Sequence, residues 1–355
     1  MFSKKFVDMV TKLRKIDDSG LLCYSKIDGD SCFRSEGSSS LVVQRKVSEE
    51  NDPSEDFCIS NSDFAKIMTL GAEFPVVSKE GSRIKFQNGG KIVFIKEIVA
   101  NMTRTITETA NGECISEIEL NSDIINVIAP ALFAAQKTAV RLQTVLSLLE
   151  YEGHLAIVAV TGSRIYIGKT DTIVENTFDP VYLSPSDLEL FYQFVSSNTD
   201  PLLQIYSNQI VLSKDGFSLS MSLMNPMTNA ENIISRFDKQ IESEDFNISP
   251  EFINTVRTAS KFGKIGTIFT TGSGVTINLN LTEYNGSTFT ADSIESARAF
   301  RATVDLELIS SALPHMSLGK IFFGTNNADQ IVLEKTFNNG SGRYFIGKMR
   351  ETQGN

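Results

Sequence analysis

Residues 249–269 read SPEFINTVRTASKFGKIGTIF, and this stretch holds the pattern on which the rest of the chain is built. Ser249 is suited to cap a helix because its hydroxyl can accept from backbone N–H groups that lack a partner, and Pro250 at the first helical position loses no donor. Phe252, Val256 and Phe262 then recur at helical spacing, which predicts one buried helix face. The apolar residues that follow predict a β-strand.

Helix starts of the same kind recur along the whole sequence. They are Ser3, Ser62, Ser122, Ser186, Ser249 and Asp305. The gaps between them are 59, 60, 64, 63 and 56 residues, so one period runs through the chain. A period of this length indicates repeated supersecondary units.

Each unit continues from its helix into β-structure. The turn residues Asp28-Gly29, Glu152-Gly153 and Gly272-Ser273-Gly274 predict hairpins in the odd-numbered units, and strand pairs recur in the even-numbered ones. A unit of ~60 residues is only marginally stable alone, so the units are expected to pair. The sequence therefore predicts an α+β fold of three domains, at residues 1–118, 119–243 and 244–355, each with two helix-plus-sheet repeats.

Composition is that of an ordinary globular protein, with 41% hydrophobic and 21% charged residues in 355. We find no signal-peptide pattern and no apolar run long enough to span a bilayer, so we expect a cytoplasmic protein without membrane contact. The four cysteines, Cys23, Cys32, Cys58 and Cys114, have no C-x-x-C spacing and are expected to be buried free thiols. With only two histidines and no ligand cluster, neither a metal nor a cofactor is predicted.

The net charge of −10 argues against a conventional nucleic-acid binder, but the charges are unevenly distributed. Basic residues collect on the predicted helices of the odd-numbered units, whereas acidic residues lie mostly in loops such as 49–56 and 238–245. The helix at 187–194 is acidic and does not follow this trend. A solvated helix face explains each basic cluster taken singly, while three clusters in repeat register favour a shared function.

Catalytic motifs are not evident. The segments 162–170 and 342–349 approach a phosphate-binding loop, but their interiors predict strands, and such a loop needs free backbone N–H groups followed by a helix. His154 and His315 belong to no H-E-x-x-H motif, and no G-x-S-x-G is present. We therefore do not predict an enzyme.

Two parts of the sequence resemble a known family. The family pattern has three parts, V-R, then a strand that ends in E-x-E-G, then A-T-D-G-H-R-L. Similar residues here are Val140-Arg141, the strand that ends at Gly153, and AVTGSRI at 159–165. The C-terminal segment YFIGKMR at 344–350 is similar to the family's Y-V-V-M-P-M-R. The family is that of the bacterial DNA polymerase III beta subunit, the replicative sliding clamp. The resemblance covers residues 137–350 best, and the first domain matches only in pattern.

The resemblance implies a homodimer in which two three-domain chains close head to tail into a ring around duplex DNA. Helices line the hole and sheets lie outside, so basic helices face phosphates without reading bases. The implied function is a processivity factor that tethers a DNA polymerase and is opened by a separate clamp loader. The DNA-facing candidates are Lys12, Arg14, Lys15, Lys137, Arg257 and Lys261.

The family also binds polymerase, clamp loader and other clamp-motif proteins through a short linear motif that enters a pocket between the second and third domains. The matching positions are Arg141, Thr144, Gly162, Arg164, Ile165, Phe262, Thr303, Leu306, Phe345, Met349 and Arg350. Phe345 and Ile165 lie in predicted strands, so either residue could instead be plain core. Thr161 and Ser163 replace the family's Asp and His, which indicates a different motif preference, and residues 351–355 extend beyond the usual end of the family.

Two other interpretations remain open from sequence. A repeat-built structural or scaffold protein would show the same period without a hole, and its basic residues would be dispersed. A catalytic domain would require a pocket that places His154 or His315 beside carboxylates. Segments near 102–109 and 289–300 are candidate edges for subunit contact.

Overall fold

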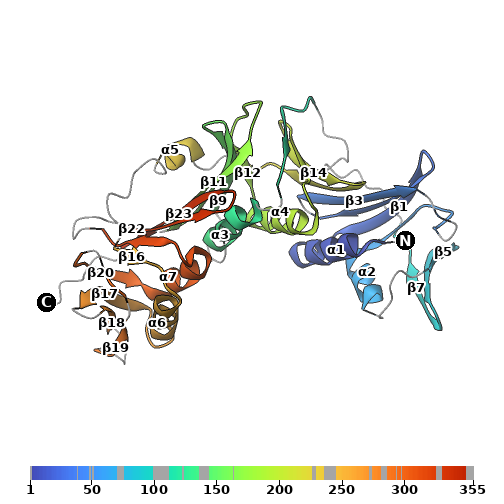
Figure 1. The fold of residues 1–355 in the computed structure, drawn as a ribbon. Helices are drawn as coiled ribbons and strands as arrows, with labels where there is room; N and C mark the ends of the chain where they lie inside the picture. The colour runs from blue at the N-terminus through green and yellow to red at the C-terminus, as the bar shows by residue number, and fades with distance from the viewer. Residues whose placement is uncertain are drawn as a thin grey trace. The chain divides into compact units, whose positions relative to one another are not determined.

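A computed structural model of the chain describes residues 2–37, 39–47, 49, 52–69, 76–98, 112–121, 124–135, 144–162, 164–225, 229–235, 245–271, 274–280, 286–292, 294–296, 298–324 and 330–348. The residues form two compact units (Figure 1). The first comprises Met1–Ser122, Val174–Phe178 and Ser186–Asn225, and the second Asp123–Ile173, Asp179–Pro185 and Pro226–Asn355. Sequence alone predicted three domains, and that division stays a prediction.

The first unit contains an eight-stranded antiparallel sheet in the order β4-β1-β2-β3-β15-β14-β13-β8. Its strands are β1 (Leu21–Ile27), β2 (Asp30–Glu36), β3 (Ser40–Val47), β4 (Phe57–Ser60), β8 (Ser116–Glu119), β13 (Leu202–Ile205), β14 (Gln209–Lys214) and β15 (Phe217–Ser222). A smaller sheet has β5 (Val76–Glu80), β6 (Arg83–Asn88) and β7 (Lys91–Lys96) in that order. The helices are α1 (Lys4–Ile16), α2 (Asn61–Met68) and α4 (Pro185–Ser197).

The second unit repeats this plan, with an eight-stranded sheet in the order β12-β9-β10-β11-β23-β22-β21-β16. Its strands are β9 (Thr144–Tyr151), β10 (His154–Thr161), β11 (Arg164–Ile173), β12 (Val181–Leu183), β16 (Phe246–Asn247), β21 (Lys320–Phe322), β22 (Gln330–Phe337) and β23 (Gly340–Gly347). The smaller sheet, β19-β18-β17-β20, comprises β17 (Ile265–Thr271), β18 (Gly274–Asn280), β19 (Thr288–Ala291) and β20 (Arg301–Asp305). The helices are α3 (Ile125–Ala135), α5 (Ala230–Ile234), α6 (Pro250–Ser260), α7 (Leu306–Ala312) and the 3-10 helix η3 (Leu313–Met316).

Three of the six predicted helix starts are confirmed. Ser3 and Ser249 accept from backbone N–H groups three residues on, each at 3.1 Å, and Asp305 caps α7 in the same way. The second start was wrong by two residues, because Ser60 rather than Ser62 accepts from the backbone N–H of Asp63 at 3.0 Å. The third predicted start, residue 122, lies outside the described residues, and α4 begins at Pro185, one residue before the predicted cap.

The predicted hairpin turns between β1 and β2 and between β9 and β10 are confirmed. Asp28 and Gly29, like Glu152 and Gly153, have positive φ at both central positions, between 50° and 89°. A two-residue turn of that type matches the right-handed twist of antiparallel strands. The two segments that approach a phosphate-binding loop are strands β11 and β23, as predicted.

Two buried tyrosines hold α3 on its sheet. Tyr166 donates to the carbonyl of Val127 at 2.7 Å, Tyr344 donates to the carbonyl of Pro130, and the two rings lie 4.8 Å apart. Burial raises the pKa of both hydroxyls, so they remain neutral donors at neutral pH. Gly342 leaves room for this arrangement, because a Cβ there would lie 2.5 Å from the Tyr166 hydroxyl.

The prediction of four free thiols was wrong for one pair. Strand β4 pairs antiparallel with β1 and brings Cys23 directly opposite Cys58, with a Cα–Cα distance of 4.2 Å, where the two form a disulfide. Cys32 is buried and Cys114 is half-buried, and neither forms a disulfide. The sequence did not indicate this pairing because the cysteines are 35 residues apart and depend on the register of two strands.

Cys23→Ser with Cys58→Ser is expected to lower the free energy of unfolding of the first unit by about 3–4 kcal/mol. The disulfide closes a loop with a sequence separation of 35 residues, and the chain-entropy relation gives a stabilisation of that size. Urea denaturation monitored by circular dichroism measures the effect. Cys114→Ser is the matched control and should change stability by less than about 0.5 kcal/mol. Equal stability of the double variant and the wild type would show that the disulfide is not formed in solution.

Among the described residues, no helix has the length and apolar character needed to cross a membrane. Within the same residues, no group of three or more His, Cys, Asp or Glu side chains is arranged to hold a metal ion.

Candidate functional site

The pairing of β11 with β23 builds the centre of the predicted peptide site. In this register Ile165 lies opposite Phe345, and Tyr166 lies opposite Tyr344. Because the tyrosines contact α3, strand alternation places Ile165 and Phe345 on the opposite face of the sheet. The structure therefore brings together two predicted site residues that are far apart in the sequence.

Helix α5 packs against this second face of the sheet. Its Ala230 and Ile234 belong to one buried apolar cluster with Phe345, Tyr182 and Val332. The partly buried side chains packed against this cluster are Tyr151, Val160, Ile165, Ile233 and Phe322. Sequence reasoning missed four of these five residues, because only the pairing of distant strands shows that they share a surface with Ile165.

Phe345 is core rather than surface, since only 5% of it is exposed. Ile165 is half-buried, so part of its side chain stays accessible to a ligand. The accessible apolar surface of the site thus consists of Ile165 and its partly buried neighbours, with Phe345 supporting it from beneath. The guanidinium of Arg298 lies 4.5 Å from the ring of Phe322, and its Nε donates to the buried carboxylate of Asp245 at 2.5 Å, so the charge of Arg298 is balanced within the protein.

Arg164 has a structural role in this region. It is 8% exposed, and its guanidinium donates to the carbonyl of Phe133 in the last turn of α3 at 3.3 Å. Burial lowers the pKa of Arg164, and the nearby Tyr344 and Asp305 oppose this shift. A guanidinium stays charged at neutral pH, so Arg164 stabilises the carbonyl end of the helix dipole.

The remaining pocket candidates are dispersed. Gly162 lies at the exposed turn before β11 with φ of 52°, and Thr303 pairs with Thr267 at 3.1 Å inside the smaller sheet. Leu306 is fully buried at the start of α7, whereas Phe262, at the end of α6, lies 5.7 Å from Phe289 of β19. The described residues do not include Arg141, Met349, Arg350, the side chain of Thr144 or residues 351–355.

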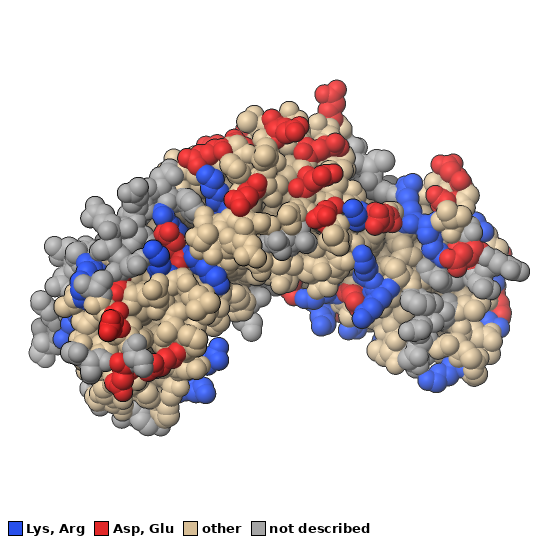
Figure 2. Space-filling view, viewed as in Figure 1, with Lys and Arg blue, Asp and Glu red and all other residues tan. Residues whose placement is uncertain are grey.

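Basic side chains gather over α1 in the first unit and beside α6 in the second (Figure 2). On α1, Lys15 is exposed and Arg14 half-buried, while Lys12 forms an ion pair with Glu189 of α4. Arg257 of α6 and Lys261, directly after α6, are exposed. Lys137 and the candidate edge at 102–109 lie outside the described residues. The acidic residue on α4 thus neutralises one of the predicted DNA-facing lysines.

No protein-family model matches the sequence, and no curated protein matches it either. Comparison with solved structures gives strong matches over almost the whole chain. The chain is similar to the Helicobacter pylori beta clamp in complex with carprofen, with a TM-score of 0.79, 10% identity and 97% of both chains covered. It is also similar to the DNA polymerase III subunit beta of Pseudomonas aeruginosa, with a TM-score of 0.77, 11% identity and 98% coverage of both.

A third similar structure contains a bound peptide. It is the H. pylori beta clamp bound to a DNA ligase peptide, with a TM-score of 0.77, 10% identity and 97% of both chains covered. The resemblance indicated by the sequence is therefore confirmed for the fold: this chain has the α+β fold of the bacterial beta clamps.

Proposed function

Because the chain has the beta-clamp fold, we propose that it is a sliding clamp that encircles duplex DNA and tethers a replicative DNA polymerase, with no chemistry of its own. It acts as a head-to-tail homodimer, and a separate clamp loader opens it. Other proteins that carry the clamp-binding motif share its peptide site. Since these partners work where DNA is replicated, the proposed location is the cytoplasm.

The observation that carries this proposal is the way the sheets join. Each eight-stranded sheet consists of two four-stranded halves, and the halves pair antiparallel through the third strand of each repeat, β3 with β15 and β11 with β23. The corresponding third strands of the two smaller sheets are β7 and β19. Among the described residues, both lie at a sheet edge. The same rule, applied between two copies, pairs β7 of one chain with β19 of its partner.

Apolar side chains near both edges support this pairing. On β7, Ile92 is 49% exposed and Phe94 is 44% exposed. Phe289 of β19 lies beside Phe262, which is 43% exposed. Long unpaired strand edges with apolar side chains invite pairing with another chain. Two equivalent contacts close a dimer, because β7 and β19 belong to different ends of the sequence and each chain supplies both.

Negative-stain electron microscopy of the purified protein tests the proposal. We expect class averages that show a two-fold ring with an open centre. Compact or filamentous particles without a hole, at concentrations where the dimer persists, would support the scaffold interpretation instead.

The peptide site lies on the α5 face of the large sheet in the second unit. Its support is the partly buried apolar surface around Ile165, together with the bound DNA ligase peptide in the similar H. pylori clamp. Apolar anchors of a linear motif would contact Ile165 and its partly buried neighbours.

Ile165→Ala is expected to weaken binding of a synthetic clamp-motif peptide by more than about 1 kcal/mol, because a partly exposed apolar side chain at the site supplies contact area to the ligand. Isothermal titration calorimetry measures the affinity. Ile173→Ala is the matched control on the same strand, since Ile173 is 70% exposed and is not part of the apolar cluster around Phe345. If both variants bind the peptide equally well, the site lies elsewhere. Phe345→Ala is unsuitable, because truncating this buried ring destabilises the fold.

A further inference from the structure

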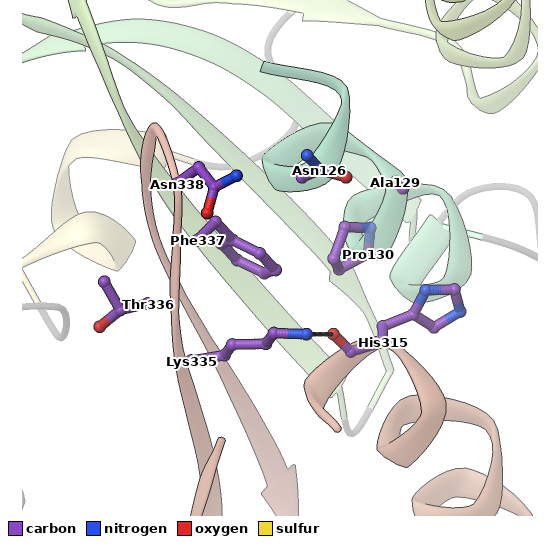
Figure 3. A pocket seen from close by; sticks show the side chains of 8 residues that line it. All are labelled: Asn126, Ala129, Pro130, His315, Lys335, Thr336, Phe337 and Asn338. Atoms are coloured by element: carbon purple, nitrogen blue, oxygen red, sulfur yellow. Dashed lines mark hydrogen bonds between the residues drawn. The ribbon is translucent and has the colours of Figure 1, made fainter. Parts of the chain in front are cut away.

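A cavity of about 310 Å³ lies in the second unit between α3, η3 and the end of β22 (Figure 3). It is lined by Asn126, Ala129, Pro130, His315, Lys335, Thr336, Phe337 and Asn338. The cavity is separate from the peptide site, because α3 covers the opposite face of the sheet from α5. Its volume suits a small organic molecule.

Lys335 supplies the positive charge of this cavity. Its ammonium group donates to the backbone carbonyl of His315 at 3.5 Å and lies 5.3 Å from the ring centroid of Phe337. None of the described residues that line the cavity carries a carboxylate, and the adjacent Glu334 pairs with Arg343 at 2.7 Å. Burial lowers the pKa of Lys335, and no acidic group opposes that shift. Among the described residues, this half-buried cation therefore has no anionic partner.

His315 adds no second charge at neutral pH. Burial, and then the charge of Lys335, lowers the pKa of His315 below its ordinary value of about 6.5. Its ring contacts the ring of Phe133 in a tilted arrangement at a centroid distance of 4.0 Å, while its backbone carbonyl faces Lys335 (Figure 3). The cavity thus carries one positive charge at pH 7.

The walls of the cavity are apolar on two sides. Phe337 points from the end of β22 toward the ring of Pro130 on α3, and Ala129 lies beside Pro130 (Figure 3). The amides of Asn126 and Asn338 are exposed at the rim and can donate hydrogen bonds. A ligand that fits this lining has one anionic group and a flat apolar body.

We propose that this cavity binds a small organic monocarboxylate. The carboxylate pairs with Lys335 and accepts from a rim amide, and the apolar body packs between Phe337 and Pro130. A phosphate dianion fits less well, because a single cation leaves half of its charge unbalanced in a partly buried site. The inference rests on the cavity alone and does not depend on the proposed function.

A fluorine NMR titration with 4-fluorobenzoate tests this inference on the full chain. We expect saturable line broadening below about 10 mM, the affinity range of a ligand with so few atoms. The neutral isostere 4-fluorobenzamide is expected to bind at least about tenfold more weakly, since it cannot pair with the ammonium group. This comparison uses the unaltered protein, so no variant has to fold for the test to be decisive.

Lys335→Met keeps the length and apolar stem of the side chain and removes its charge. We expect this variant to bind 4-fluorobenzoate at least tenfold more weakly, whereas Lys214→Met, a half-buried strand lysine in the first unit, should bind like the wild type. The proposal would be overturned by equal binding to the Lys335 variant, by equal affinity for the benzamide, or by no saturable broadening. Each of these outcomes can occur whether or not the chain is a sliding clamp.

Discussion

Ile92→Lys combined with Phe94→Lys is expected to convert the proposed dimer into monomers. Both side chains lie on β7, the edge strand proposed to pair with β19 of a second copy, and both are about half exposed in the single chain. Buried apolar anchors at the centre of an interface are often worth about 2 kcal/mol each, so their loss should weaken dimerisation by at least about a hundredfold. Sedimentation velocity across a dilution series measures this change.

Val76→Lys is the matched control for that experiment. Val76 lies on β5, at the opposite edge of the same small sheet, and is 50% exposed. The substitution places one lysine, against two in the β7 variant, at an apolar position of similar exposure, so the dimer should persist. A dimer that survives the β7 substitutions, or dissociates equally with the β5 substitution, would contradict the proposed edge pairing.

The repeat plan could be predicted because it depends on local signals. Helix caps such as Ser249 and Asp305 and turns such as Glu152-Gly153 are determined by side chains within a few residues, and the structure confirms them. The joining of repeats into eight-stranded sheets could not be predicted in the same way. The contact of β3 with β15 links residues about 175 positions apart, and its register depends on which edges are left open.

The candidate peptide site shows the same limit. Ile165 and Phe345 were selected on resemblance, and the register of β11 with β23 places them side by side. The exposure of Ile165 and Phe345 depends on α5, which covers this face of the sheet. Helix α5 has five residues, which are too few to show a helical period in the sequence. Phe262 follows the helical spacing of α6, yet the packing of β19 places it beside Phe289.

The disulfide and the α3 cavity were missed for a related reason. Cys23 and Cys58 become partners only through the pairing of β1 with β4, and Lys335 faces a cavity only because α3 and η3 pack near the end of its strand. Glycines 168 and 342 looked like parts of phosphate-binding loops in the sequence. In the structure they pair with each other in adjacent strands and leave space for the tyrosines that hold α3.

Replacing Lys15, Arg257 and Lys261 together with Gln is expected to weaken the association of the proposed ring with duplex DNA at least about tenfold at physiological salt. All three side chains are exposed on α1 and α6, or directly after α6, where basic residues gather. Each phosphate contact that is lost should reduce the slope of log affinity against log salt by roughly 0.9. Fluorescence anisotropy with a circular primed template at several salt concentrations measures the slope, and processive synthesis should fall in parallel.

Replacing Lys26, Lys214 and Lys320 with Gln is the matched control, because it removes the same number of positive charges from strands β1, β14 and β21. If DNA association responds only to overall charge, both triple variants will lose affinity equally, and the basic helices have no special role. If the helix residues face the phosphates, the strand variant will keep the wild-type salt slope while the helix variant loses it. Lys12 is left unchanged in both, since its ion pair with Glu189 already offsets its charge and its removal would break this link between α1 and α4.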